Sequence, residues 1–314
     1  MPNIYLKSIK KRILGKLFLD IGSSKNIIFV AGPGRGGTTW LTSLIAKAFG
    51  YRQIFEPFWS LHLSADNIKD FFHHRFIPSD CSKYDDSIKF VLDAKYKTRS
   101  TFHVNHNFHP GPFHGRIIKD ICSNLFLPRI HAVRPDMPII YIMRHPCAVV
   151  ASRIKTDQMN MQWGLHTYLF NEQKKFIDLY FKGETIKPKN QLEDHIISYC
   201  YENFIPHHFL KNEPYIYTIF YESLILDFQN QFNKLIEFIE EFSMQKHRKN
   251  NIKLIDGRTD LANKGTIESL RSDPKKYLTA WKEHFNHQEE KLIHNILMKF
   301  NMISLLDKTE KIIS

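Results

Sequence analysis

The sequence contains little cysteine and no long hydrophobic run. Its 314 residues include four cysteines, at positions 81, 122, 147 and 200, and no two of them form a C-x-x-C pair. This spacing indicates neither a zinc site nor a disulfide framework, and it is typical of a protein from a reducing compartment. No run of 18 apolar residues occurs, so we expect no membrane-spanning helix. A cytoplasmic location is therefore predicted.

Negative charge is also scarce. Lys and Arg number 44 and Asp and Glu number 32, which gives a net charge of +12. Such an excess favours an anionic ligand, a nucleic acid or an acidic membrane surface. Because the lysines and arginines are scattered rather than gathered in blocks, no nucleic-acid partner is predicted. The 43% hydrophobic and 24% charged residues are typical of a globular chain and exclude collagen-like and largely disordered chains.

Residues 1–25 have the pattern of a basic amphipathic helix. Ile9, Ile13 and Leu17 share one helical face, and lysines surround it. Such a helix either packs on the rest of the protein, the commoner arrangement, or makes a peripheral contact with an anionic membrane through residues 4–19. We expect residues 26–314 to form a single domain.

Apolar strands alternate with helical patterns in this second part. Strands are expected at 26–31, 51–56, 116–119, 137–143 and 215–220, and helices at 38–50, 122–133, 228–242 and 274–300, with a further helix starting near 148. A helical insertion is expected at about 155–212, with a loop at 182–190, and residues 60–114 are expected to be irregular. This alternation predicts an α/β fold with a central parallel sheet and helices on both faces.

A glycine-rich turn, residues 32–37 (GPGRGG), follows the first strand and precedes a helix that starts with Thr38 and Thr39. Strand, turn and helix in this order make an anion site, because the amides of the turn and of the first helical turn point at the ligand. A nucleoside-triphosphatase would need a lysine where Thr38 stands. The G-x-G-x-x-G spacing, with Glu56 about 20 residues further on, leaves an NAD-dependent oxidoreductase as an alternative.

A second segment, residues 139–153 (IIYIMRHPCAVVASR), suits another phosphate. Arg144 ends a buried strand, where ligands of open α/β sheets bind, and Pro146 starts the next helix. Ser152 lies eight residues after Arg144, and a guanidinium with a hydroxyl can clamp a phosphate. An ordinary strand-end ion pair is the alternative role for Arg144. Two phosphate sites on one sheet suit a nucleotide that carries phosphates at both ends of its ribose.

These segments resemble the sulfotransferases that use 3′-phosphoadenosine-5′-phosphosulfate (PAPS). Residues 32–41 (GPGRGGTTWL) are similar to the family's 5′-phosphosulfate loop, with Gly36 in place of the usual Ser, and residues 139–153 resemble its 3′-phosphate segment. Residues 54–59 (IFEPFW) are similar to a string of carbohydrate sulfotransferases, and 116–119 (RIIK) and 220–224 (FYESL) resemble further family strings. The resemblance covers most of residues 26–300 and implies a three-layer fold like that of P-loop nucleoside triphosphatases.

The resemblance also implies roles for single residues. The 5′ side of PAPS would be held by Arg35, Gly36, Gly37, Thr38, Thr39 and Trp40. Its 3′-phosphate would be held by Arg144 and Ser152, and Lys264 loosely matches a loop that covers the nucleotide. Arg35 and Lys119 would stabilise charge during the transfer, Glu56 would act as general base, and no metal is required.

The remaining roles stay open at this stage. Glu56 can instead be an ion-pair partner or a turn residue. One of the histidines at 103, 106, 109 and 114 is the alternative base. The spacing of these histidines matches no helical pair of zinc ligands. The predicted acceptor is a carbohydrate or glycolipid hydroxyl, with a non-sugar small molecule as alternative, and PAP is the expected product. A non-catalytic basic protein that binds nucleic acid or anionic glycans is the last alternative.

Overall fold

The computed structural model describes residues 21, 26–58, 76–93, 111–157, 167–242 and 273–314. In these residues five parallel strands form one sheet in the order β2-β3-β1-β4-β5. The strands are β1 (Ile27–Ala31), β2 (Arg52–Phe55), β3 (Arg116–Asp120), β4 (Ile139–Met143) and β5 (Ile216–Phe220). The predicted parallel sheet is confirmed, and the carboxyl ends of β1, β3 and β4 lie side by side at its centre.

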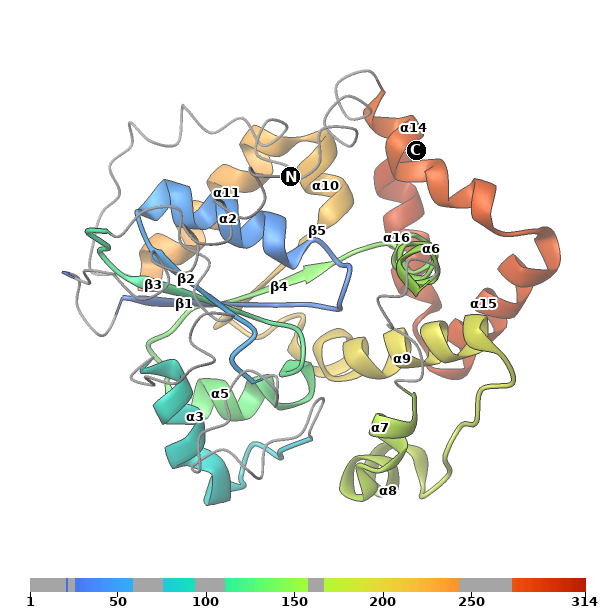
Figure 1. Ribbon diagram of the computed structural model, residues 1–314, viewed down its shortest axis with the longest axis horizontal. Coiled ribbons are helices and arrows are strands. Elements are labelled where there is room, and N and C mark those ends of the chain that lie inside the picture. The colour runs from blue at the N-terminus through green and yellow to red at the C-terminus, as the bar shows by residue number, and fades with distance from the viewer. Residues whose placement is uncertain (1–20, 22–25, 59–75, 94–110, 158–166, 243–272) are drawn as a thin grey trace, which may run out of the picture.

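Helices cover both faces of the sheet (Figure 1). In β1, Ile28 and Val30 pack into an apolar cluster on one face, with α2 (Thr38–Phe49), α10 (Tyr221–Leu226) and α11 (Phe228–Phe242). Ile27, Phe29 and Ala31 pack into the cluster on the other face, with α5 (Leu127–Val133) and α9 (Gln191–Ile205). Because both faces are covered, the strand reads as a continuous apolar run. The architecture is the predicted three-layer α/β fold of the P-loop type.

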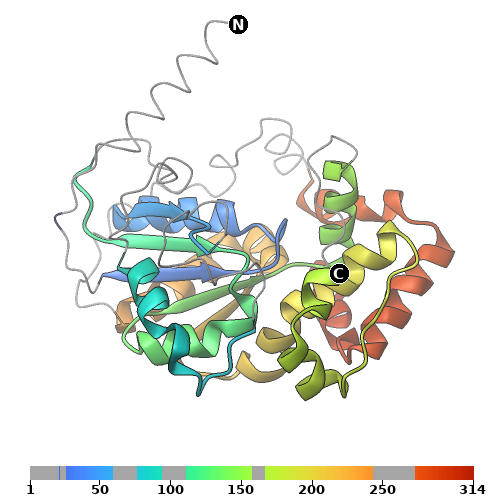
Figure 2. The same ribbon diagram turned by 60° about the horizontal axis from the view of Figure 1, so that its bottom comes forward.

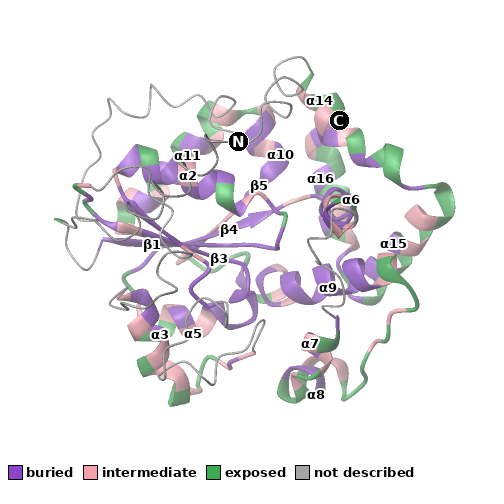
Figure 3. Ribbon diagram, viewed as in Figure 1, coloured by how far each residue is buried: buried purple, intermediate pink, exposed green. Residues whose placement is uncertain are grey.

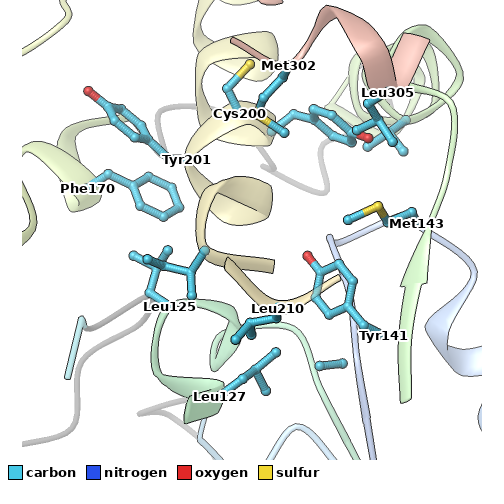
Figure 4. Packing of buried hydrophobic residues seen from close by; sticks show 14 of the residues in the cluster. Leu125, Leu127, Tyr141, Met143, Phe170, Cys200, Tyr201, Leu210, Met302 and Leu305 are labelled. Carbon is cyan, nitrogen blue, oxygen red and sulfur yellow. The ribbon is translucent and has the colours of Figure 1, made fainter. Parts of the chain in front are cut away.

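A second group of helices lies beyond the carboxyl ends of the strands (Figures 1 and 2). It consists of α6 (Pro146–Asp157), α7 (Thr167–Asn171), α8 (Lys174–Phe181), α9, a π-helical turn η4 (Pro206–Leu210), α14 (Pro274–Thr279), η5 (Ala280–His284), α15 (His287–Lys299) and α16 (Ile303–Ile313). Helix α9 is buried along most of its length (Figure 3). Figure 4 shows its Cys200 and Tyr201 among side chains of other elements, which include Phe170, Tyr141, Met143 and Leu305.

The structure differs from the sequence-based expectations in three places. Helix α3 (Asp85–Leu92) occupies part of the segment that was expected to be irregular, with two aspartates in its first turn and Ile88, Val91 and Leu92 buried. Helices α10 and α16 were not expected. The single helix expected over 274–300 is interrupted, because Phe285 is extended and Asn286 starts α15 with a capping box to Glu289.

Some expectations concern residues outside the described ranges. The amphipathic helix over 4–19, Lys264, and His103, His106 and His109 all lie there. Among the helices that the structure describes, none has the length and apolar character needed to cross a bilayer.

Candidate active site

The two predicted phosphate segments meet at the centre of the sheet edge. Strands β1 and β4 are paired with Ala31 opposite Tyr141, so the turn after β1 lies beside the residues that follow β4. Nη1 of Arg144 donates a hydrogen bond of 3.0 Å to the carbonyl oxygen of Arg35. The adjacency on which the two-phosphate interpretation depends is therefore present.

The turn after β1, which leads into α2, has an unusual backbone conformation. Arg35 has φ 69° and Gly37 has φ 96°, both in the left-handed region. The amide of Gly36 donates to the carbonyl of Pro33 at 2.8 Å. Gly36, predicted as a phosphate donor, is thus engaged inside the turn. The amides of residues 37–39 are the remaining candidate donors, since the first amides of a helix have no partner within it.

Gly37 is required by both its backbone angle and its neighbour. A Cβ atom at this position would lie 2.6 Å from Cδ2 of Tyr221. Gly183 has a similar φ of 82°, but its nearest atom would be Asp178 Oδ1 at an ordinary 3.5 Å. Gly183→Ala is therefore a control in which only the left-handed backbone conformation, and no steric clash, destabilises the protein.

Replacing Gly37 by alanine is expected to lower the free energy of unfolding by about 3 kcal/mol, against about 1 kcal/mol for Gly183→Ala. The difference reflects the displacement of the Tyr221 ring. Urea unfolding of both variants measures it. If both variants lose the same free energy of unfolding, the Tyr221 ring moves aside without destabilising the protein, which would contradict this prediction.

Three guanidinium groups lie close to the turn, those of Arg35, Arg144 and Arg153. Arg35, which is exposed, donates from Nε to Oγ of Ser152 on α6 at 3.0 Å. Partial desolvation of its guanidinium by the surrounding protein lowers the pKa of Arg35, and repulsion from Arg144 and Arg153 lowers it further. The hydroxyl and arginines that were assigned to two separate phosphates therefore form one continuous cationic site.

Aromatic rings hold the Arg144 side of this site. The Arg144 guanidinium carbon lies 4.6 Å from the ring centroid of Tyr221, a cation–π contact. Tyr221 also packs edge-on against Trp40, with centroids 5.3 Å apart, and its hydroxyl lies 3.2 Å from that of Tyr277. Tyr221 lies in the string 220–224, which resembles a string of the family, but its contacts with both phosphate segments were not predicted.

A second cluster lies at the ends of β2 and β3. Nζ of Lys119 forms an ion pair with Oε1 of Glu56, and both side chains are buried. The same Nζ lies 4.0 Å from the ring centroid of Phe55. Two of the three residues predicted to act in catalysis, Glu56 and Lys119, are thus in direct contact through an ion pair. Because Asp120 pairs with Ala31 across β3 and β1, this cluster flanks the glycine-rich turn.

Asp120 completes the second cluster and was missed by the sequence analysis. Its side chain is fully buried, with Oδ2 accepting from the amide of Phe58 at 2.9 Å and Oδ1 from the amide of Cys122 at 2.7 Å. It therefore holds the turn that carries Glu56 against the end of β3. Its only sequence signal was a carboxylate directly after the strand-end Lys119.

Burial raises the pKa of Asp120 to about 7. Since this lies above the value in an unfolded chain, about 3.9, the folded protein binds the proton more tightly. Asp120 should therefore make the free energy of unfolding fall as pH rises from about 4 to about 7. Replacing it by asparagine is expected to flatten that fall by up to ~1.4 kcal/mol per pH unit. Urea unfolding between pH 4.5 and 7.5 measures the slopes, and parallel curves would contradict the assignment.

The cation-rich site has the chemistry of an anion site. In the described parts of the chain, no group of three or more His, Cys, Asp or Glu side chains could hold a metal ion. His114, the one described member of the histidine stretch, is exposed, and its amide donates to the carbonyl of Gly50 at 3.2 Å. Positive charge at the site comes from arginine and lysine side chains.

Comparison with known proteins points to one family. Among solved structures, the fold is similar to a mouse sulfotransferase, SULT7A1, complexed with PAP, with 16% identity, a TM-score of 0.46 and coverage of 96% of this chain and 94% of that one. It is also similar to the sulfotransferase domain from the curacin biosynthetic pathway, with 12% identity, a TM-score of 0.46 and coverage of 87% and 97%. No curated protein sequence matches significantly. The family model described as the sulfotransferase domain matches residues 25–299, and the chain therefore belongs to the sulfotransferase family.

Proposed function

We propose that this enzyme transfers the sulfuryl group of PAPS to a hydroxyl of a carbohydrate or glycolipid. The observation that carries the proposal is the meeting of the two phosphate segments, in which Arg35 contacts both Ser152 and Arg144. A donor with phosphates on both sides of its ribose needs two such groups of cations within one cavity. NAD carries no 3′-phosphate for Arg144 and Ser152, and the family assignment also sets the oxidoreductase alternative aside.

The residues present fit this donor. Nε of Arg144 is buried and has no hydrogen-bond partner among the described residues, so it can donate to a phosphate. The first amides of α2 and the hydroxyl of the exposed Thr39 are further donors that can bind an anion. In this assignment Arg35 with residues 37–39 holds the 5′-phosphate, and Arg144 with Ser152 holds the 3′-phosphate.

The cluster at the ends of β2 and β3 supplies the remaining chemistry. In the transfer, the acceptor oxygen bonds to sulfur as the bond from sulfur to the 5′-phosphate oxygen breaks, and PAP leaves. Glu56 takes the proton of the acceptor hydroxyl. Lys119 orients Glu56 through their ion pair. The charge of Lys119, with that of Arg35, stabilises the negative charge that develops on the transferred group and the leaving oxygen.

A sugar acceptor is supported by the position of Glu56. It lies in the string at residues 54–59 that resembles carbohydrate sulfotransferases, and it contacts the predicted catalytic lysine. Transfer of radiolabelled sulfate from PAPS to a panel of glycans, glycolipids and phenols tests the proposal. Label on glycans or glycolipids supports it, label on phenols alone would replace the acceptor class, and no label together with no binding of PAP would overturn the donor.

A further inference from the structure

Helix α9 contacts the second phosphate segment, residues 139–153, at two places. The hydroxyl of Tyr199, which is fully buried, donates to the backbone carbonyl of Arg144 at 2.7 Å. One turn further on, Glu202 forms an ion pair of 2.6 Å with Nη2 of Arg153. Helix α9 belongs to the segment, about residues 155–212, that was expected as a helical insertion.

Arg153 links α9 to the glycine-rich turn. Its side chain is fully buried, and Nε and Nη2 donate to the carbonyl of Gly34 at 3.3 and 3.0 Å. A charge at 0% exposure is costly unless it is paired and hydrogen-bonded, which Glu202 and the Gly34 carbonyl provide. The arrangement is therefore a fixed connection between α9 and the turn.

This connection acts on a strained residue. Arg35 has φ 69°, a conformation that costs a non-glycine residue free energy and persists only where the surroundings determine it. The carbonyl before it is held by Arg153, and its own carbonyl is held by Arg144. Both holding residues are in turn held by α9, through Glu202 and Tyr199.

Helix α9 is itself anchored to the sheet. The hydroxyl of Tyr141 on β4 donates to Oδ1 of Asn203 at 2.9 Å, and Nδ2 of Asn203 donates to the carbonyl of Tyr199 at 2.7 Å. The positions of Tyr199 and Glu202 are therefore fixed relative to the strand that ends at Arg144.

We propose that Tyr199 and the Arg153–Glu202 pair are positioning residues that set the affinity for the donor without touching it. Tyr199 acts on the 3′-phosphate side through Arg144, and Arg153 acts on the 5′-phosphate side through Gly34 and Arg35. This inference rests on the proposed function, because it assumes that the two sides bind the two phosphates of one nucleotide.

Calorimetric titration with PAP and with 5′-AMP, which lacks the 3′-phosphate, separates the two sides. Tyr199→Phe is expected to raise the Kd of PAP about fivefold and to leave that of AMP within about twofold, as for one lost hydrogen bond on the 3′ side. Arg153→Lys keeps the positive charge but loses the planar guanidinium with its two N–H donors to Gly34. It is expected to raise the Kd of both ligands about tenfold.

Tyr201→Phe is the matched control. Tyr201 is equally buried on the same helix, but its hydroxyl donates to Oδ1 of Asn171 on α7, at 3.3 Å, rather than to a phosphate segment. It should leave the affinity for both ligands within about twofold. Thermal unfolding of each variant verifies that it is folded, and the isosteric Tyr199→Phe carries the test if Arg153→Lys does not fold.

Three results would overturn the inference. Tyr199→Phe could bind PAP as tightly as the wild type, Tyr201→Phe could weaken PAP as much as Tyr199→Phe, or Tyr199→Phe could weaken PAP and AMP equally. The last two would mean that any loosening of α9 has the same effect. Failure of the wild-type protein to bind PAP would instead overturn the proposed donor, and this inference with it.

Discussion

Replacing Arg144 by alanine is expected to weaken the binding of PAP about 100-fold, which corresponds to ~3 kcal/mol. Its guanidinium bridges the two phosphate segments, donating to the carbonyl of Arg35 while it lies over the ring of Tyr221. Loss of a charge-assisted contact with a phosphate is among the largest single effects on anion affinity. Arg144→Lys should recover only part of the loss, because an ammonium group lacks the planar fork. Calorimetry of both variants measures the change.

The matched control is Arg134→Ala. This substitution removes the same charge as Arg144→Ala, but Arg134 is paired with Asp93 and Asp136 near the end of α5. If net charge alone attracts the nucleotide, both variants will lose affinity to the same small extent. If Arg144 contacts the nucleotide, Arg134→Ala will bind PAP within about twofold of the wild type.

Replacing Glu56 by glutamine is expected to lower the rate of sulfuryl transfer about 10²- to 10⁴-fold, the usual contribution of a general base. The amide oxygen can still accept a hydrogen bond from Nζ of Lys119, so the buried lysine keeps a partner. The amide cannot take the proton of the acceptor. Affinity for PAP should therefore stay within about threefold, since Glu56 lies outside both phosphate segments. Single-turnover transfer from labelled PAPS gives the rate, and calorimetry gives the affinity.

Two results would contradict this role. An unchanged transfer rate in Glu56→Gln would leave Glu56 as a structural partner of Lys119. A large loss of rate in His114→Gln, with Glu56→Gln unaffected, would move the base to the histidine stretch. Lys119→Ala is a poorer probe, because it leaves a buried carboxylate unpaired, at a cost of about 3–5 kcal/mol in stability.

Features encoded locally could be predicted from the sequence. The apolar runs of β1 and β4 and the glycine-rich turn are continuous strings, and both faces of the sheet are covered as such strings require. The meeting of Arg35 and Arg144 followed from one rule, that ligand sites form at the carboxyl ends of parallel strands. The 3.0 Å hydrogen bond from Nη1 of Arg144 to the carbonyl oxygen of Arg35 shows that the two strand ends are adjacent.

Features that join distant parts of the chain could not be predicted. Tyr199 and Arg144 are 55 residues apart, and Arg153 and Glu202 are 49 apart, so no local pattern links them. Their pairing depends on how α9 packs under the sheet edge. Asp120 was missed for a related reason, because one of its two partners, the amide of Phe58, is 62 residues away in the sequence and reaches it only when β2 and β3 have paired.

The measurement that tests the central claim most directly is the affinity of the wild-type protein for PAP relative to 5′-AMP. These ligands differ only by the 3′-phosphate, which is assigned to Arg144 and Ser152. A site with two phosphate-binding sides should bind PAP about 100-fold more tightly than AMP. Equal affinities would mean that the residues after β4 hold no phosphate, and the assignment of the donor would be wrong.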